Sequence, residues 1–251
     1  LAGNDTINLA QGGGESAGLY VSLGGGADVL TASGINLTGA GTILGGAGGD
    51  SITITGTGDS FLNLGKLGDG NDTLTIASGF ELEEGSIFGG GGADTITLGS
   101  FVKTGALLNG DSSVNGGGAD SITIGTLGED TDVKGKGGSD TISITTIGSG
   151  AIVEGNAGGD LLTVSTFGSG ARVQAGAGND TISIGFESTG VIVAGGGADS
   201  ITVSAAGGDY AGLEVALGAG SDTLTYSTGV AGGAYGSVEI SALSDSTVSS
   251  I

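Results

Sequence analysis

The side chain best placed to do chemistry in this sequence is an aspartate that returns at nearly constant spacing. Gly stands two residues before this Asp, and Ile or Leu stands two residues after it. Eleven copies of the block follow one another, 19 to 26 residues apart. Their aspartates are Asp5, Asp28, Asp50, Asp72, Asp94, Asp120, Asp140, Asp160, Asp180, Asp199 and Asp222.

Stacked repeats would bring these carboxylates into one column, about 5 Å apart, which is the spacing of neighbouring strands. Two like charges at that distance repel by about 1 kcal/mol in water and by several in a medium of lower dielectric constant. A divalent cation between neighbouring carboxylates reverses the sign of this energy. Carboxylate and carbonyl oxygens are hard ligands that suit Ca²⁺. The column therefore predicts bound calcium, and the alternative is an ordinary solvated turn residue.

The glycine before each Asp allows a positive φ, and we expect it to aim backbone carbonyls inward as further ligands. The turn positions expected to contribute are Gly26, Gly48, Gly70, Gly92, Gly118, Gly138, Gly158, Gly178, Gly197 and Gly220. The gaps between eleven repeats would hold about ten ions in one row, about +20 in charge against a net charge of −22.

The segments on both sides of the Asp have the period-two alternation of β-strands. After Asp140, Ile142 and Ile144 would point inward and the hydroxyl residues between them outward. Before the turn, Val133 is the inward residue, and the same offset is occupied by Val153, Val173, Ile192 and Val215. Glycine-rich turns over 146–150 and 166–170 would close the far end of each repeat.

Each repeat is thus strand, aspartate turn, strand and far turn, and no repeat can bury its apolar face alone. We expect an all-β, right-handed parallel β-roll or β-solenoid of about eleven coils, roughly 20–22 residues each, with two strands per coil. The 26-residue spacing before Asp120 predicts a surface loop near Ser100 to Ser113. Residues 1–228 form the repeats, and 229–251 form a terminal strand or partial cap around Ile240. The chain reads as a piece of a longer protein.

Composition excludes several classes of function. The sequence has no His and no Cys, which excludes imidazole or thiolate metal sites and the usual catalytic pairs built on them. Five Lys and Arg against 27 Asp and Glu argue against nucleic-acid binding. No apolar run is long enough for a membrane span. We therefore expect neither an enzyme nor direct membrane insertion. Regularly placed aliphatic residues, within 37% hydrophobic residues, argue against disorder.

Two segments carry a family resemblance. Residues 45–53 (GGAGGDSIT) and 89–97 (GGGGADTIT) fit the nonapeptide G-G-x-G-x-D-x-U-x. The chain resembles the RTX-type calcium-binding β-rolls of S-layer and other type I-secreted bacterial surface proteins. That resemblance implies export from a Gram-negative cell and folding in extracellular calcium.

The sequence departs from that family in three ways. Only one of the two turns of each coil carries the motif, so we expect a single row of ions. Lys136 and Asn156 replace a motif glycine, which puts the geometry of those two sites in doubt. The opposite turn has acids in no common register, and they could hold isolated extra ions: Asp59, Asp111, Glu129, Asp130 and Asp209.

The leading functional hypothesis is a calcium-folded structural repeat region of a secreted cell-surface protein, such as an S-layer subunit, a filament or sheath protein, or an adhesin stalk. Self-association into a lattice or filament is expected, and anchoring to surface polysaccharide would use regions outside this sequence. The main alternative is the C-terminal secretion and folding module of an RTX enzyme or toxin. An ice-binding adhesin segment and a β-helical polysaccharide lyase or epimerase are weaker alternatives. The outward Ser and Thr rows (Thr53, Thr75, Thr97 and Thr123) fit a solvated sheet face or a binding surface.

Overall fold

The fold was taken from a computed structural model of the 251-residue chain. The structure describes residues 2–10, 15–16, 20–37, 41–56, 58–60, 62–63, 65–77, 80–82, 85–101, 105–112, 117–186, 189–205, 212–227, 239–242 and 246–250. All regular secondary structure in these ranges is β-strand. A search of the same ranges finds no helix with the length and apolar character needed to cross a membrane.

The strands that follow each aspartate form one parallel sheet, called sheet 1 here. It has 13 strands, ordered β1-β4-β6-β10-β13-β15-β17-β19-β21-β23-β25-β27, with β2 paired to β4. The strands are β1 (Thr6–Ala10), β2 (Glu15–Ser16), β4 (Val29–Leu37), β6 (Ser51–Gly56), β10 (Thr73–Ile76), β13 (Thr95–Phe101), β15 (Ser121–Leu127), β17 (Thr141–Ile147), β19 (Leu161–Phe167), β21 (Thr181–Phe186), β23 (Ser200–Ala205), β25 (Thr223–Tyr226) and β27 (Thr247–Ser250).

The strands that precede each aspartate form the second parallel sheet, sheet 2. It has 12 strands, ordered β26-β24-β22-β20-β18-β16-β14-β12-β9-β5-β3, with β8 paired to β5. The strands are β3 (Tyr20–Gly25), β5 (Gly41–Ala47), β8 (Leu62–Asn63), β9 (Lys66–Asp69), β12 (Ser86–Gly91), β14 (Leu107–Asp111), β16 (Asp132–Gly137), β18 (Ile152–Ala157), β20 (Ala171–Ala177), β22 (Gly190–Gly196), β24 (Leu213–Ala219) and β26 (Glu239–Ala242).

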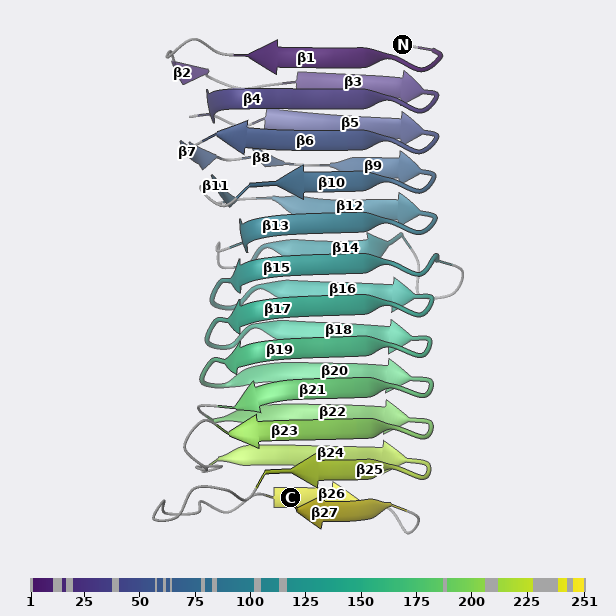
Figure 1. The fold of residues 1–251 in the computed structure, drawn as a ribbon, viewed down its shortest axis with the longest axis vertical. Helices are drawn as coiled ribbons and strands as arrows, with labels where there is room; N and C mark the ends of the chain where they lie inside the picture. Colours follow the sequence, from purple (N-terminus) through teal and green to yellow (C-terminus); the bar gives the residue numbers. More distant parts are fainter. Residues whose placement is uncertain are drawn as a thin grey trace.

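The chain alternates between the two sheets, so successive coils stack along one long axis (Figure 1). This confirms the predicted all-β class and the parallel β-solenoid. The tight turns from sheet 2 to sheet 1 form a column along one edge, at the right in Figure 1. From the β3–β4 turn to the β24–β25 turn, each of them contains one of the recurring aspartates.

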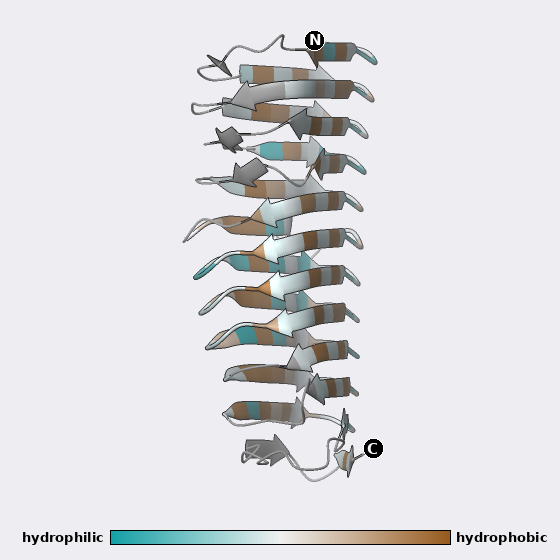
Figure 2. Ribbon diagram, turned by 60° about the vertical axis from the view of Figure 1, so that its left-hand side comes forward, coloured by the Kyte–Doolittle hydropathy of each residue, from teal (hydrophilic) through white to brown (hydrophobic). Residues whose placement is uncertain are grey.

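The core is a thin layer between the sheets, filled in register from coil to coil. Ile142 stacks on Ile122 and Leu162, and Val133 stacks on Val153. All of these side chains are buried, while alternate residues face solvent, which produces the banding seen in Figure 2. The hydroxyl row Thr53–Thr75–Thr97–Thr123 also lies in register, on the outer face of sheet 1. The predicted inward and outward positions are therefore confirmed.

Aromatic packing near the far turns was not anticipated from the sequence. Phe101 and Phe167 are each 1% exposed, and Leu127 and Ile147 lie between them in the same stacked row of sheet 1. Burying each such side chain contributes about 1.5–3 kcal/mol. This row closes the core on the edge opposite the aspartates.

The coils are less uniform than predicted. Three-residue strands β7 (Gly58–Ser60) and β11 (Phe80–Leu82) pair with each other in a separate two-stranded sheet, and β2 and β8 are also additional short strands. Uniform two-strand coils are therefore fewer than the eleven expected. The connections at the far turn are uniformly short between β15 and β22, so the most regular coils lie there.

The extra residues before Asp120 also lie elsewhere than predicted. Strand register aligns Asp111 with Gly90, while Gly118 sits against the carbonyl of Gly92 in the coil before it. Residues 112–117 thus occupy the part of the coil that Gly91 alone occupies in the coil before it. This extension lies on the aspartate edge, mostly beyond the range of 100–113 predicted for the surface loop. Of this extension, 113–116 lie outside the described residues.

The C-terminal segment continues both sheets. Strand β26, which includes Ile240, pairs with β24, and β27 pairs with β25. The sequence predicted one final strand, and the structure has two.

Candidate cation site: a buried aspartate ladder

The recurring aspartates occupy equivalent places in successive coils, but they are buried rather than solvated. From Asp28 to Asp222 each is only 1–2% exposed, and Asp5 is half-buried. The alternative of an ordinary solvated turn residue is therefore wrong. Each carboxylate points into the end of the thin core, beside the turn.

From Asp28 to Asp199, three of the four polar groups of each aspartate form hydrogen bonds between coils. The backbone N–H of Asp120 donates to Asp140 Oδ1 at 2.8 Å, and the N–H of Asp140 donates to Asp160 Oδ1 at 2.8 Å. The carbonyl of Asp140 accepts the N–H of Leu161 at 2.8 Å. The same pattern of N–H to Oδ1 bonds runs from Asp5 to Asp222, so the aspartates form a continuous ladder.

The fourth group, Oδ2, is buried without a hydrogen-bond partner. This holds for Asp5, Asp28, Asp50, Asp72, Asp94, Asp120, Asp140, Asp160, Asp180 and Asp199. The ladder ends differently, because Ser246 holds the equivalent position in the last coil and its hydroxyl donates to Asp222 Oδ2 at 3.2 Å.

In five coils the orphaned oxygen lies near a second acceptor, a backbone carbonyl of the next coil; these are the coils of Asp50, Asp94, Asp120, Asp140 and Asp160. A Cβ added to Gly135 would collide with Asp140 Oδ2 and would lie 3.0 Å from the carbonyl oxygen of Gly155 in the next coil. A Cβ added to Gly45 would likewise lie 2.7 Å from Asp50 Oδ2 and collide with the carbonyl oxygen of Leu67. Two oxygen acceptors thus border one small space, and neither brings a donor. A buried charge in such a place is costly unless a proton or a cation neutralises it.

The electrostatics of the ladder agree with this geometry. Burial raises the pKa of Asp120 to about 8 and that of Asp140 to about 7, and neighbouring carboxylates add to the rise. Burial also raises the pKa values of Asp72, Asp94 and Asp180 to about 6. In each case the backbone N–H bond to Oδ1 offsets part of the shift. The ladder is therefore prepared to take up positive charge, as protons or as metal ions.

The donor set fits a hard divalent cation. Carboxylate Oδ2 atoms and main-chain carbonyls from adjacent coils are the oxygen ligands that Ca²⁺ prefers. In the described part of the chain, no three acidic side chains gather around one point. Backbone carbonyls would therefore have to complete the coordination of an ion held by the ladder. Calcium would supply the positive partner that the orphaned carboxylate oxygens lack.

The turn glycines have the backbone conformation expected of them, with one exception. Gly26, Gly48, Gly70, Gly92, Gly138, Gly158, Gly178, Gly197 and Gly220 have φ between +116° and +144°. Gly118, which follows the extension, is not in the positive-φ region. A Cβ on Gly138 would collide with the carbonyl oxygen of Gly118, and Gly158 stands in the same relation to Gly138. The glycine carbonyls thus approach the next coil, in the space between neighbouring turns.

The two replaced motif glycines keep the glycine backbone. Lys136 has φ of 86° and Asn156 has φ of 80°, in a row where Gly46, Gly68 and Gly90 have φ of 127–131°. The positive φ of this row therefore survives both substitutions.

Sequence reasoning missed a second, intermittent ladder on the outside of the turns. Asn4 Oδ1 accepts the N–H of Ala27, Asn71 Oδ1 that of Ala93, and Asn179 Oδ1 that of Ala198, at 2.8–2.9 Å. Ser139 accepts from Gly159 in the same way at 3.2 Å. The signal was present, because each of these polar residues directly precedes a ladder aspartate.

Among the acids predicted on the opposite turn, Asp111 was misplaced. It lies at the end of β14 on the aspartate edge, is 1% exposed, and has its pKa raised by burial. Glu129 and Asp130 are exposed on the far turn, as expected. Asp209 and the side chain of Asp59 lie outside what the structure describes.

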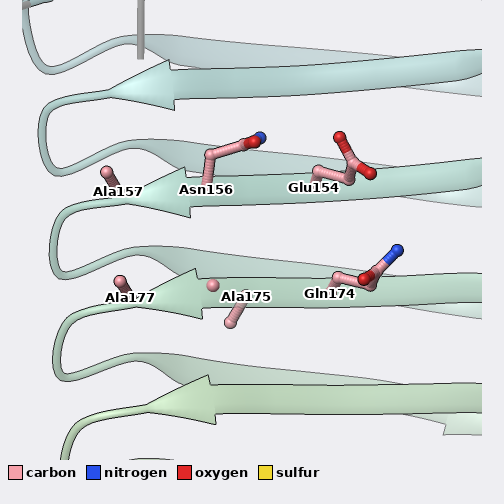
Figure 3. A pocket seen from close by; sticks show the side chains of 7 residues that line it. Glu154, Asn156, Ala157, Gln174, Ala175 and Ala177 are labelled. Carbon is pink, nitrogen blue, oxygen red and sulfur yellow. The ribbon is translucent and has the colours of Figure 1, made fainter. Parts of the chain in front are cut away.

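A shallow groove of about 390 Å³ lies on the outer face of sheet 2 (Figure 3). Glu154 and Asn156 line it from β18, and Gln174 lines it from β20, with small residues at its floor. Glu154 is its one ionisable lining residue, so the groove has no pair of groups suited to acid–base chemistry.

No protein-family model, no curated protein and no solved structure is significantly similar to this chain. The function must therefore be inferred from the ladder itself.

Proposed function

We propose that this chain is a calcium-dependent structural repeat region, of the RTX type, from a secreted bacterial surface protein. The observation that carries the proposal is the row of buried, unpartnered Asp Oδ2 atoms facing backbone carbonyls. One row of about ten Ca²⁺ ions, held by the ladder carboxylates and by backbone carbonyls of the adjacent coil, neutralises this row and joins each coil to the next.

The ladder makes folding depend on the compartment. Without positive charge the buried carboxylates oppose stacking, and weak oxygen sites fill only where calcium reaches the concentrations found outside cells. A chain of this kind stays extended inside the cell, passes through a type I secretion channel of a Gram-negative bacterium, and folds outside. The motif resemblance supports that route.

The architecture supports a role in assembly rather than catalysis. The outermost described strands of sheet 1, β1 and β27, each have a single neighbour in the sheet order, and a parallel strand edge is a template for pairing. A further coil or a second molecule can dock there. Such stacking, with calcium bridges between acidic rods, would produce an S-layer, a filament or a sheath. The same stacking within one chain would produce an adhesin stalk.

The test is a calcium titration of the chelated chain at pH 7.5, followed by far-UV circular dichroism, with light scattering on the same samples. We expect a cooperative gain of β-signal as about ten ions bind, and then a rise in scattering. A full β-signal that removal of calcium leaves unchanged would refute the calcium ladder. Folding with flat scattering would refute only the assembly part of the proposal.

A further inference from the structure

The coil that carries the extension differs from its neighbours in one charged residue. Asp111 is the last residue of β14 and pairs with Gly90 of β12. Other coils have a residue with positive φ at this position, usually glycine. Asp111 is 1% exposed and belongs to no Gly-x-Asp block, so this coil has a buried carboxylate in addition to that of Asp120.

Two buried side-chain oxygens on this strand have no hydrogen-bond partner. They are Asp111 Oδ2 and Asn109 Oδ1, and Asn109 is 8% exposed. The two residues are separated by one position, so they lie on the same face of β14. Asp111 Oδ1, by contrast, accepts the N–H of Gly118 at 3.3 Å. Burial raises the pKa of Asp111 overall, although the backbones of Gly118 and Gly137 lower it in part.

A backbone carbonyl lies close to Asp111 Oδ2. A Cβ added to Gly117 would collide with both Asp111 Oδ2 and the carbonyl oxygen of Gly137 in the next coil. A carboxylate oxygen and a backbone carbonyl thus converge here, with an amide oxygen one step back along the strand. Hard oxygens of these three kinds are characteristic ligands of Ca²⁺.

No described basic side chain neutralises Asp111. Lys134 pairs in register with Asn109, but its ammonium contacts Glu154 at 3.0 Å and Asp132 at 3.7 Å. Lys136, farther along β16, forms no ion pair with Asp111 within the described residues. Asp111 is also close enough to Asp94, Asp120 and Asp140 to raise the pKa of each of them. Negative charge is therefore more concentrated at this coil than a single ladder residue would make it.

We propose that Asp111 and Asn109, with the carbonyl of Gly137, form an additional divalent-cation site beside the ladder, outside the repeated motif. It deepens the calcium-binding function proposed above and rests on it. The site gives this coil one ion more than the regular row supplies. Its ligands are held between β14, the turn at Gly117 and the next coil, so calcium bound here pins the extension to the rod.

The experiment compares calcium stoichiometry in the full chain, by equilibrium dialysis with radioactive calcium at pH 7.5. The variants are Asp111→Asn, which keeps the acceptor for Gly118, and Asn109→Ala, which changes no charge. The matched control is Glu214→Gln, which removes the same charge from an exposed residue of β24. Circular dichroism in saturating calcium checks that each variant folds.

We expect Asp111→Asn to bind one ion fewer than the parent, and Asn109→Ala to weaken one site at least tenfold. Glu214→Gln should match the parent. If both site variants bind the parental number of ions with parental affinities, the additional site does not exist, while the ladder proposal stands. If the parent itself binds no calcium, the proposed function fails as well. Should Asp111→Asn not fold, the result for Asn109→Ala decides.

Discussion

Protons and calcium ions should substitute for one another in the ladder, which makes pH a direct probe of it. Five ladder aspartates have pKa values raised from 3.8 to between about 6 and about 8 by burial and by their neighbours. The folded state therefore binds more protons than the unfolded chain between pH 3.8 and 8. Since stability falls with pH wherever the folded state binds more protons, calcium-free protein should be most stable below pH 4.

The size of this effect exceeds what a small solenoid can tolerate. For Asp140, a rise from 3.8 to about 7 corresponds to roughly 4 kcal/mol lost once the pH is above both values. Even a quarter of that figure at each of the eight ladder positions with a raised pKa would total about 8 kcal/mol, within the 5–15 kcal/mol by which ordinary proteins are stable. We expect calcium-free protein to fold near pH 4.5 and to unfold as the pH passes through 6 to 8.

The assay is far-UV circular dichroism across pH 4 to 8.5 at low protein concentration. Calcium is first removed by dialysis against a chelator. A parallel series contains about 5 mM calcium, which exceeds the dissociation constants of typical extracellular calcium sites. Calcium should move the unfolding midpoint to higher pH, because the metal ion displaces the protons. A calcium-free β-signal that is constant across the range, or greatest at pH 8, would refute the assignment of the buried Oδ2 atoms as the source of the instability.

Three substitutions test individual parts of the ladder. Asp140→Asn should imitate the protonated carboxyl by donating to the Gly155 carbonyl. Without calcium it should raise the pH of the unfolding midpoint, measured by circular dichroism. In calcium it should lower the free energy of unfolding by about 2–3 kcal/mol, which is the stabilisation lost with one ion present at 100 times its Kd. An equal effect with and without calcium would contradict this. Lys136→Gly should raise the free energy of unfolding in calcium by about 1 kcal/mol, measured by urea denaturation, because a lysine with positive φ is strained; a loss of stability would show that the side chain compensates. Gly197→Ala should lower the free energy of unfolding by about 3 kcal/mol or more in the same assay, since Gly197 has φ of +144° and an added Cβ would collide with the preceding coil. Its neighbour Gly196 has nothing within 4 Å of an added Cβ, so Gly196→Ala should lower it by less than about 1 kcal/mol. Similar losses for the two variants would contradict the close approach of the backbones at Gly197.

Much of the fold could be predicted because one local pattern repeats in every coil. The Gly at position −2, the Asp, and the aliphatic residue at +2 fix the turn and the inward face, and the alternation around Ile142 and Val133 is as expected. What the sequence could not show is how the coils meet. The bond from the N–H of Asp120 to Oδ1 of Asp140 joins residues 20 apart and depends on the exact stacking register.

The irregular parts escaped prediction for a related reason. The position of an extension is read from strand pairing, and only the pairing of Gly90 with Asp111 shows that the extra residues lie after β14. Asp111 therefore looked like one of the scattered acids of the far turn. Ser246 was equally hard to recognise, because it replaces the ladder aspartate without the flanking glycine that marks the other copies.

The pairwise character of the ladder explains why a column of ions would serve such a rod better than a larger core. Each Oδ1 bond and each pair of facing acceptors lies between two coils rather than within one, so stability is set by nearest-neighbour interfaces. The aliphatic layer is thin, because the coil is only two strands deep, and glycine at the turns brings the backbones too close for larger side chains. A cation bound at each interface would add attraction where the core is weakest. Without it the same interface would be repulsive, so that one ion concentration would switch every coil together.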